Sequence, residues 1–597
     1  MRSITFKRAL FIGSAFLLAF AAASLFGVVI TANGTSPIHW AMVALLLVCC
    51  IWLAWGFNTA VAGILSRRGA PPRSAAVPWR GSSRTAVLVP VYNEDATAVF
   101  ARVAAMLRGL MEIDPSHRFD MHVLSDSTKP DCVVAEKRAA QRVAEALGAS
   151  GRLYYRHREK NTGRKAGNIA DFVTRSGGAY EYMLILDADS LMRPETMLEM
   201  AARMEADPEL GLLQTQPLII GRHTIFGRAL QFSAALFSPV FSRGIAALQG
   251  REGPFWGHNA IIRTRAFAAA CGLPKLPGKA PFGGEILSHD SIEAALLARA
   301  GYTVRVDPDL EGSYEEAPST LIEYAKRDRR WCQGNLQHGG LLAAPGLRTW
   351  SRISLFTGIM AYVASPIWLL FLVVSLLDPV LAPAPNYFPA DSLFPVFPHP
   401  ETGKALLLLV GIFVLLLLPK TLIAFSRAFS AKGRAFGGWF AVLAGATAEL
   451  VLTSVLAPVM MMFQSKAVAE ILVGADSGWP STEREDGRLP VRAAFAASWW
   501  MVIAGGFLLW AAWTYAPDLV LWVLPIALPL LLAPVLISWT GDRALGESVE
   551  RTGLFATPFE LDPEPVIRDA AAWRQRLEPA PRADDPLPDD ARPIAAE

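Results

Sequence analysis

The sequence is poor in cysteine, with five in 597 residues. Cys49 and Cys50 lie inside a long apolar run, and the others are scattered without a Cys-x-x-Cys pair. This spacing argues against a zinc site and against a disulfide framework. A soluble domain without disulfides is typical of the reducing cytoplasm.

The sequence also lacks a GxxxxGK[ST] loop, which argues against a transporter with a regulatory nucleotide domain. Its net charge is only +3, and no basic segment is interleaved with aromatic residues, so nucleic acid is not an expected partner. What it has in excess is apolar sequence. Hydrophobic residues make up 52% of the chain, too many for a soluble enzyme of this length.

Long apolar runs at both ends of the chain predict a membrane protein with about six spans. Residues 10–30 and 40–65 are each long enough to cross, and the basic residues on their outer flanks place both ends of this hairpin in the cytoplasm. Four later spans are predicted at residues 355–377, 405–422, 493–513 and 519–539. The sequence between the two groups carries charged residues throughout and is predicted to be one soluble domain.

A further apolar segment, 439–463, has basic residues on both sides, from Arg434 to Lys466. A crossing would place positive charges outside, so the segment is predicted to lie along the cytoplasmic interface, with a crossing helix as the alternative. The predicted organisation is residues 1–66 as two spans, 84–345 as a cytoplasmic domain, 352–540 as four spans with the interfacial helix, and 541–597 as a cytoplasmic tail that is partly disordered.

Predicted strands and helices alternate within the soluble domain. Strands are predicted at residues 86–90, 121–125, 152–155 and 182–186, and helices at 96–110, 133–147 and 166–174. Such alternation is typical of a doubly wound, mostly parallel α/β sheet. Ligands bind such sheets at the edge where the strands end.

Two carboxylates, Asp187 and Asp189, end the fourth predicted strand. Side chains two residues apart on an extended chain point the same way, so these two would repel each other unless a cation lay between them. The pair therefore suits a Mg²⁺ or Mn²⁺ that also holds a substrate diphosphate. The plainer interpretation is a solvated turn after a strand.

Other polar residues are expected at the same edge. Asn93 and Glu94 follow the first strand, Asp126 follows the second, and Lys165 precedes the third helix. Together they suit a nucleotide sugar, with Lys165 on the diphosphate. Taken singly, each has a plainer interpretation: a helix cap for Asn93 or Asp95, a turn for Asp126 and a solvated side chain for Lys165.

The motifs Pro-Val-Tyr-Asn-Glu-Asp, Ser-Asp-Ser, Gly-Arg-Lys-Ala-Gly-Asn and Asp-Ala-Asp-Ser resemble those of processive family 2 glycosyltransferases, whose catalytic domain has the GT-A fold. The resemblance covers residues 85–337 and includes Phe-Trp-Gly-His-Asn at 255–259, Ser-His-Asp at 288–290 and Arg-Asp-Arg-Arg-Trp at 327–331. The last two differ from the Thr-Glu-Asp and Gln-x-x-Arg-Trp of cellulose and hyaluronan synthases. They are similar to those of one branch, the bacterial glucosyltransferases H of osmoregulated periplasmic glucan synthesis.

The resemblance implies that Asp290 is the general base that deprotonates the acceptor hydroxyl. It also implies a nucleotide-sugar site made by Asn93, Glu94, Asp126, Lys165, Asp187 and Arg330, and an acceptor site made by Trp256, His258 and Trp331. Two alternatives stand beside these roles. Asp290 to Glu293 has the form of a capping box that opens a helix at 292–299. Trp331 also fits a membrane interface, and Trp256 a packed core.

Residues 464–490 are expected to form a cytoplasmic loop beneath the membrane. In cellulose-synthase-like enzymes a loop at this place closes over bound nucleotide, and the resemblance implies such a gating role here for Asp476 and Trp479. The loop lacks the Phe-x-Val-Thr-x-Lys pattern of those enzymes. An ordinary surface loop is the alternative.

The expected function is a processive, inverting glucosyltransferase of the bacterial inner membrane that uses UDP-glucose and Mg²⁺ or Mn²⁺. The resemblance implies a growing β-1,2-glucan as acceptor, with the lipid bilayer and periplasmic glucan-processing proteins as partners. A synthase of another β-glycan, such as cellulose, and a lipid-carrier glycosyltransferase are the alternatives. Ser288 and His289 in place of Thr-Glu, and a tail too short for a β-barrel regulatory domain, disfavour cellulose.

Overall fold

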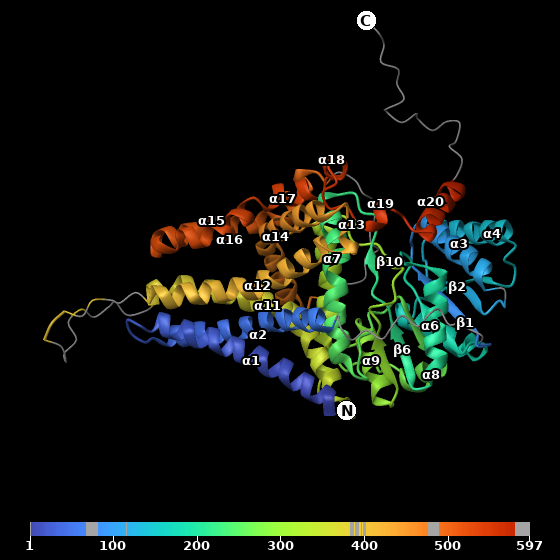
Figure 1. The fold of residues 1–597 in the computed structure, drawn as a ribbon, viewed down its shortest axis with the longest axis horizontal. Coiled ribbons are helices and arrows are strands. Elements are labelled where there is room, and N and C mark those ends of the chain that lie inside the picture. Colours follow the sequence, from blue (N-terminus) through green and yellow to red (C-terminus); the bar gives the residue numbers. More distant parts are fainter. Residues whose placement is uncertain are drawn as a thin grey trace, which may run out of the picture.

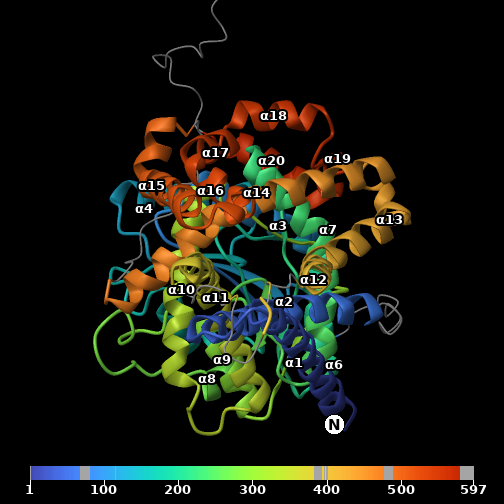
Figure 2. The same cartoon turned by 90° about the vertical axis from the view of Figure 1, so that its left-hand side faces the viewer.

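The structure is a computed structural model that describes residues 2–66, 81–114, 116–381, 387, 393–395, 397, 401–475 and 489–578. It consists of an α/β domain and a group of long helices that extend from one side of that domain (Figure 1). Seen from the free ends of these helices, the α/β domain lies behind them (Figure 2).

A seven-stranded sheet forms the centre of the α/β domain, in the order β3-β2-β1-β4-β8-β6-β9. Only β8 runs antiparallel to its neighbours, β4 and β6. The strands are β1 Thr85–Val91, β2 Phe119–Ser125, β3 Leu153–His157, β4 Tyr182–Ile185, β6 Leu210–Gln214, β8 Ala260–Arg263 and β9 Thr303–Val306. The central strands are buried on both faces, as parallel strands covered by helices are. The predicted mostly parallel α/β sheet is confirmed.

Helices cover this sheet, and a small second sheet adjoins it. The helices that matter for the site are α3 Ala96–Ile113, α4 Pro130–Leu147, α5 Arg164–Ser176, α9 His289–Arg299 and α10 Leu321–Gln337. The second sheet has the order β5-β10-β7, with β5 Leu191–Met192, β10 Ser313–Glu315 and β7 Leu218–Ile219. Every helix and strand predicted before residue 187 is present.

Six helices in the described part of the chain are long and apolar enough to cross a membrane. They are α1 Arg2–Ile30, α2 Pro37–Leu65, α11 Thr349–Leu381, α12 Thr402–Ala428, α14 Trp439–Leu472 and α15 Val491–Tyr515. The set differs from the six predicted spans. It includes α14, and the span predicted at 519–539 is divided into α16 Val520–Leu531 and α17 Ala533–Thr540, bent by 59°. Pro534 at the start of α17 has no N–H to continue the preceding helix, which accounts for the break.

Helix α14 is longer than expected; the short helix before it, α13 Ala431–Arg434, and its own C-terminal part both contact the α/β domain. Just before it, Lys432 Nζ lies 2.8 Å from Glu311 Oε1, and near its end Glu470 Oε2 lies 2.9 Å from Arg329 Nε. The segment predicted as a loop from residue 464 is helical as far as Leu472. No glycine or proline interrupts it until Gly474, which has a φ of +94°.

Helix α7, Ile225–Gln249, was not predicted and joins the α/β domain to the membrane helices. It crosses α2 at two glycines. A Cβ added at Gly244 would lie 2.0 Å from the carbonyl oxygen of Thr59, and one added at Gly63 would lie 1.9 Å from that of Val240. The backbones of the two helices are therefore in direct contact, as small residues allow between membrane helices.

The C-terminal arm returns to the α/β domain instead of remaining at the membrane. It contains α18 Arg543–Arg551, α19 Pro558–Leu561 and α20 Pro565–Leu577, and α20 packs against α3 (Figure 1). Arg228 of α7, which is almost fully buried, pairs with Glu550 and Glu560 of this arm at 3.1 Å and 2.6 Å. The arm therefore connects the membrane helices to the outer face of the domain.

We predict that Gly244→Val destabilises the protein, because the added side chain pushes α7 away from α2. Overpacking of this kind costs about 1–3 kcal/mol, so thermal unfolding of the detergent-solubilised protein should begin at a lower temperature. Gly13→Val is the matched control, since nothing lies within 4 Å of a Cβ at Gly13. Equal unfolding temperatures for the two variants would show that the α2–α7 contact contributes nothing.

Candidate active site

The parallel strands bring the predicted acidic residues to one edge of the sheet. Strand β1 pairs with β2 on one side and with β4 on the other. Their ends therefore lie side by side, and the segments that follow them carry Asn93, Asp126 and the Asp187–Asp189 pair. The backbone N–H of Asp187 donates to Ser190 Oγ at 2.9 Å, which fixes the start of the acidic turn.

Lys165 connects the acidic pair to a second segment of the domain. Its Nζ forms an ion pair with Asp187 and donates a hydrogen bond to the carbonyl oxygen of Gly257 at 2.7 Å. Lys165 comes from the first turn of α5, and Gly257 from the loop before β8. Both partners are polar groups of the predicted site, so Lys165 is not simply a solvated side chain.

Asp290 lies against the same glycine. A Cβ added at Gly257 would be 3.3 Å from Asp290 Oδ2, and Gly257 has a φ of +87°, in the left-handed region that favours glycine. The backbone of Gly257 thus lies between the Asp290 carboxylate and Lys165 and is close to both. The residue predicted as base, the lysine and the acidic pair are brought together at one place.

The predicted capping box at Asp290 is wrong. Helix α9 begins at His289 with Ser288 as its N-cap, and no side chain caps it. Glu293 is buried and lies 3.1 Å from Nδ1 of His289, so it does not reach back to the backbone of Asp290. Asp290 therefore lies in the first turn of the helix.

His258 is close to the acidic pair. Its Nε2 lies 3.4 Å from Glu315 Oε2, and its Nδ1 lies 3.2 Å from Asn259 Oδ1. Burial lowers the pKa of His258, but the carboxylates of Asp187 and Glu315 raise it more, so its pKa lies above the ordinary value. The protonated form of the ring is therefore favoured by the two carboxylates beside it.

Trp256 and His258 are held by a residue that the sequence did not indicate. Gln214, at the end of β6, is fully buried; its Oε1 accepts from the backbone N–H of Trp256 at 3.0 Å, and its Nε2 donates to the carbonyl of His258 at 3.0 Å. The Trp256 side chain is half-buried. A glutamine at a strand end has no sequence signature, so only the fold reveals this role.

Asn93, predicted to bind the donor, connects two neighbouring loops. Its Oδ1 accepts hydrogen bonds from the backbone N–H groups of Thr128 and Lys129, both at 3.0 Å. Asp95, and not Asn93, caps α3. Glu94 lies between them in the same loop.

Asp126 is buried and accepts two hydrogen bonds from Arg158, at 2.7 Å and 2.8 Å. Beneath it lies Glu136, a buried carboxylate that the sequence analysis missed. Glu136 accepts hydrogen bonds from three hydroxyl groups, those of Ser125, Ser127 and Tyr155, at 2.6 Å, 2.6 Å and 2.9 Å. It therefore fixes the end of β2, although nothing in its sequence context distinguishes it from a surface glutamate.

Trp331 lies on α10 and has 47% of its surface exposed. The guanidinium of Arg327, which stands where cellulose synthases have glutamine, lies 4.6 Å from the centre of the Trp331 ring. One face of the indole is thus covered by a cation–π contact. Arg330, another arginine of the motif, directly precedes Trp331.

Helix α10 is fixed to the segment that carries Asp290. A Cβ at Gly334 would lie 2.1 Å from Ser288 Oγ, so only glycine permits this contact. His338 Nε2 lies 2.9 Å from the carbonyl oxygen of Ser288, and Gln337 Oε1 accepts from the N–H of Leu287 at 3.0 Å. The tryptophan helix and the predicted base are therefore positioned relative to each other.

The same helix is also fixed to the membrane helices. Asp328, which is 7% exposed, accepts a hydrogen bond from Gln464 Nε2 of α14 at 2.9 Å. Gln464 Oε1 in turn accepts from Ser365 Oγ of α11 at 2.5 Å. Burial raises the pKa of Asp328. This buried cluster joins α10 to two membrane helices.

The acidic pair suits a divalent metal that binds together with a nucleotide. No group of three or more metal-ligating side chains is assembled among the described residues. Mg²⁺, however, is commonly held by one or two carboxylates with substrate phosphates and water as its other ligands. Asp187 and Asp189 meet that requirement.

Sequence comparisons agree with this architecture. Residues 182–537 match the family described as Glycosyl transferase family group 2, and residues 86–269 match Glycosyl transferase family 2. The chain is 49% identical to the Glucans biosynthesis glucosyltransferase H of Cereibacter sphaeroides over 545 residues, 90% of either chain. It is 42% identical to that of Rhodopseudomonas palustris, over 94% of this chain and 78% of the relative. The chain belongs to the glucosyltransferase H family.

Membership of the glucosyltransferase H family confirms the resemblance found in the sequence and makes the protein a family 2 glucosyltransferase. Among solved structures, the mannosyltransferase PcManGT of Pyrobaculum calidifontis, in complex with GDP-Man and Mn²⁺, has a TM-score of 0.43 and 16% identity. That similarity covers 72% of this chain and 99% of the mannosyltransferase.

Two residues predicted to gate the site, Asp476 and Trp479, lie outside the described part of the chain.

We predict that Gly257→Ala strongly slows sugar transfer without unfolding the domain. The added methyl group contacts Asp290 and strains a backbone that requires a positive φ, and a displacement of about 1 Å at a reacting group can cost about a hundredfold in rate. Gly178→Ala is the matched control, because nothing lies within 4 Å of its Cβ. Activity comparable to the control would mean that Asp290 does not need this contact.

Proposed function

We propose that this glucosyltransferase is an inverting, processive enzyme that transfers glucose from UDP-glucose to the growing linear β-1,2-glucan of osmoregulated periplasmic glucans. The contact that supports it most is the one through Gly257, which brings Asp290 within one residue of Lys165 and Asp187. Sugar transfer requires the base and the diphosphate site to be close together, because the base and the leaving diphosphate lie on opposite sides of the sugar C1.

In this reaction Asp290 takes the proton of the acceptor hydroxyl as its oxygen bonds to C1 of glucose. The bond from C1 to the diphosphate oxygen breaks, UDP leaves, and the configuration at C1 inverts. Asp187 and Asp189 hold the Mg²⁺ or Mn²⁺, which supplies charge neutralisation of the diphosphate. Lys165 exchanges part of its pairing with Asp187 for the diphosphate.

The remaining residues divide between donor and acceptor. Asn93, Glu94 and Asp126 follow β1 and β2 and contact the uridine, and Arg330 contacts the diphosphate. Trp331 stacks on the acceptor glucan with the face of its ring that Arg327 leaves uncovered. Trp256 and His258 line the acceptor side next to the acidic pair.

The proposed arrangement places the α/β domain and both chain ends in the cytoplasm. It places α14 along the cytoplasmic interface, because α13, just before that helix, and Glu470, near its end, contact the same domain, whereas a crossing helix would carry its ends to opposite sides. Asp476 and Trp479 follow α14 directly and gate the nucleotide site. The glucan then passes through the membrane helices to periplasmic glucan-processing proteins.

The test is synthesis by the purified enzyme in lipid nanodiscs with radiolabelled UDP-glucose and Mg²⁺. We expect a polymer with β-1,2 linkages that depends on the metal. A β-1,4 polymer would instead identify a cellulose-like synthase, and a single labelled sugar that partitions with lipid would identify a lipid-carrier transferase. Either result contradicts the proposal.

Substitution of the three acids should separate metal binding from base catalysis. Asp187→Asn and Asp189→Asn should abolish polymer formation and weaken Mn²⁺-dependent binding of UDP, whereas Asp290→Asn should abolish polymer formation and leave UDP binding within about two-fold. Calorimetry with UDP and Mn²⁺ provides the binding constants. Normal synthesis by Asp290→Asn would leave that residue no catalytic role.

Asp328 should affect elongation more than donor use, because it fixes the tryptophan helix to the membrane helices. Asp328→Ala should shorten the product while KM for UDP-glucose stays within about two-fold. Asp328→Asn, which retains an acceptor for Gln464, should preserve product length. If the alanine variant shows an increased KM and unchanged product length, the proposed coupling to elongation is wrong.

A further inference from the structure

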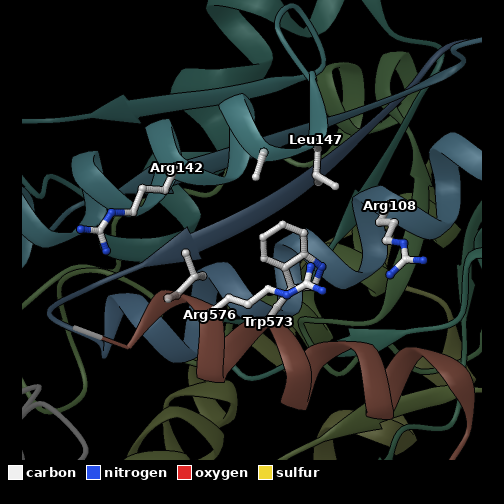
Figure 3. A pocket seen from close by; sticks show the side chains of 7 residues that line it. Arg108, Arg142, Leu147, Trp573 and Arg576 are labelled. Atoms are coloured by element: carbon white, nitrogen blue, oxygen red, sulfur yellow. The ribbon is translucent and has the colours of Figure 1, made fainter. Parts of the chain in front are cut away.

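A hollow far along α3 from the donor loop has no part in the proposed reaction. It has a volume of about 580 Å³ and lies between α3, α4 and α20. Its lining is formed by Arg108, Arg142, Ala146, Leu147, Trp573, Arg576 and Leu577. In Figure 3, Arg108 and Arg142 stand on opposite sides of the hollow with the Trp573 ring between them.

The arginine side chains at the rim of the hollow carry more positive charge than the nearby carboxylates neutralise. Arg108 lies near Glu112 and Asp569, at 3.0 Å and 3.8 Å. Arg142 and Arg576 form no ion pair with any carboxylate of the described residues. A ligand for this rim must therefore be an anion.

The floor of the hollow is apolar. Trp573 is 4% exposed, and the Arg576 guanidinium lies 5.2 Å from the centre of its ring. Ala146, Leu147 and Leu577 complete the floor. A fitting ligand therefore combines negative charges with an apolar centre, and a simple inorganic anion would leave the floor uncovered.

The chain itself contains such a segment directly after α20. Residues 584–590 read Asp-Asp-Pro-Leu-Pro-Asp-Asp, with an acidic pair on each side of an apolar centre. We propose that this segment binds in the hollow of its own chain, with Leu587 on the floor and the aspartate pairs on the arginine rim. Leu577 already lines the hollow, and each following residue extends the chain by up to about 3.5 Å, enough for the segment to turn back.

The covalent connection favours this occupant over free anions. A short tether gives an intramolecular ligand an effective concentration of about millimolar. The docked segment fastens α20 against α3, the helix that begins directly after the donor loop. Arg574 of α20 lies 3.8 Å from Asp95, the cap of that helix. The inference does not depend on the proposed reaction.

Disulfide crosslinking of the full-length enzyme in nanodiscs tests the proposal. Ala146→Cys with Leu587→Cys should crosslink under mild oxidation, and the yield should fall at about 1 M salt, where the Debye length is about 3 Å. Ala146→Cys with Ile594→Cys is the matched pair outside the acidic segment and should crosslink less. Equal yields from the two pairs would overturn the proposal.

Charge reversal provides the second part of the test. Adding Arg142→Glu and Arg576→Glu should lower the crosslinking yield about five-fold, as expected for the loss of exposed ion pairs. Arg138→Glu, on the same helix but outside the hollow, should not lower it. Changing Asp584 and Asp585 to arginine in the doubly reversed variant should restore the yield, and failure to restore it counts against the assigned pairing.

Tripolyphosphate distinguishes the tail from a free anion as the natural occupant. It should bind more tightly to a variant with Asp584, Asp585, Asp589 and Asp590 all changed to asparagine than to the unchanged enzyme, because the tail no longer competes. Equal affinity for the two proteins, measured by calorimetry, would show that the hollow is a site for free anions. That result would overturn the proposal while leaving the glucosyltransferase proposal intact.

Discussion

The contact of Lys165 with both Asp187 and the carbonyl of Gly257 is the interaction on which the candidate site depends. It joins the end of β4 to the loop before β8, and the same glycine lies against Asp290. Three segments that are distant in sequence therefore meet at one residue without a Cβ. A side chain at 257 would separate the acidic pair from the residue proposed as base.

Helix α10 provides the second constraint, because it is fixed at two places. On one side Gly334 approaches Ser288 so closely that α10 and the start of α9 form one unit. On another, buried Asp328 accepts a hydrogen bond from Gln464 of α14, which in turn accepts one from Ser365 of α11. The position of Trp331 thus depends on both the catalytic domain and the membrane helices, as the proposed elongation of a glucan requires.

The sequence predicted the strands and the residues at their ends well, because alternating patterns and the parallel order of β1, β2 and β4 are encoded locally. It did not predict Glu136, Gln214 or the partners of Asp328, because their roles arise from hydrogen bonds between segments far apart in the chain. The predicted capping box was wrong for the same reason, since Glu293 has a closer partner in His289. Pro534 marks the bend between α16 and α17 in the sequence, but a proline in an apolar run does not by itself determine where a helix breaks.

The most direct test of the site is an experimental structure with UDP and Mn²⁺, in which the anomalous signal of the metal marks its position. We expect the metal at about 2.0–2.3 Å from carboxylate oxygens of Asp187 or Asp189, with the diphosphate beside Lys165 and Asp290 still against Gly257. A metal that contacts neither aspartate, or an Asp290 carboxylate turned away from the sugar position, would contradict the proposed site.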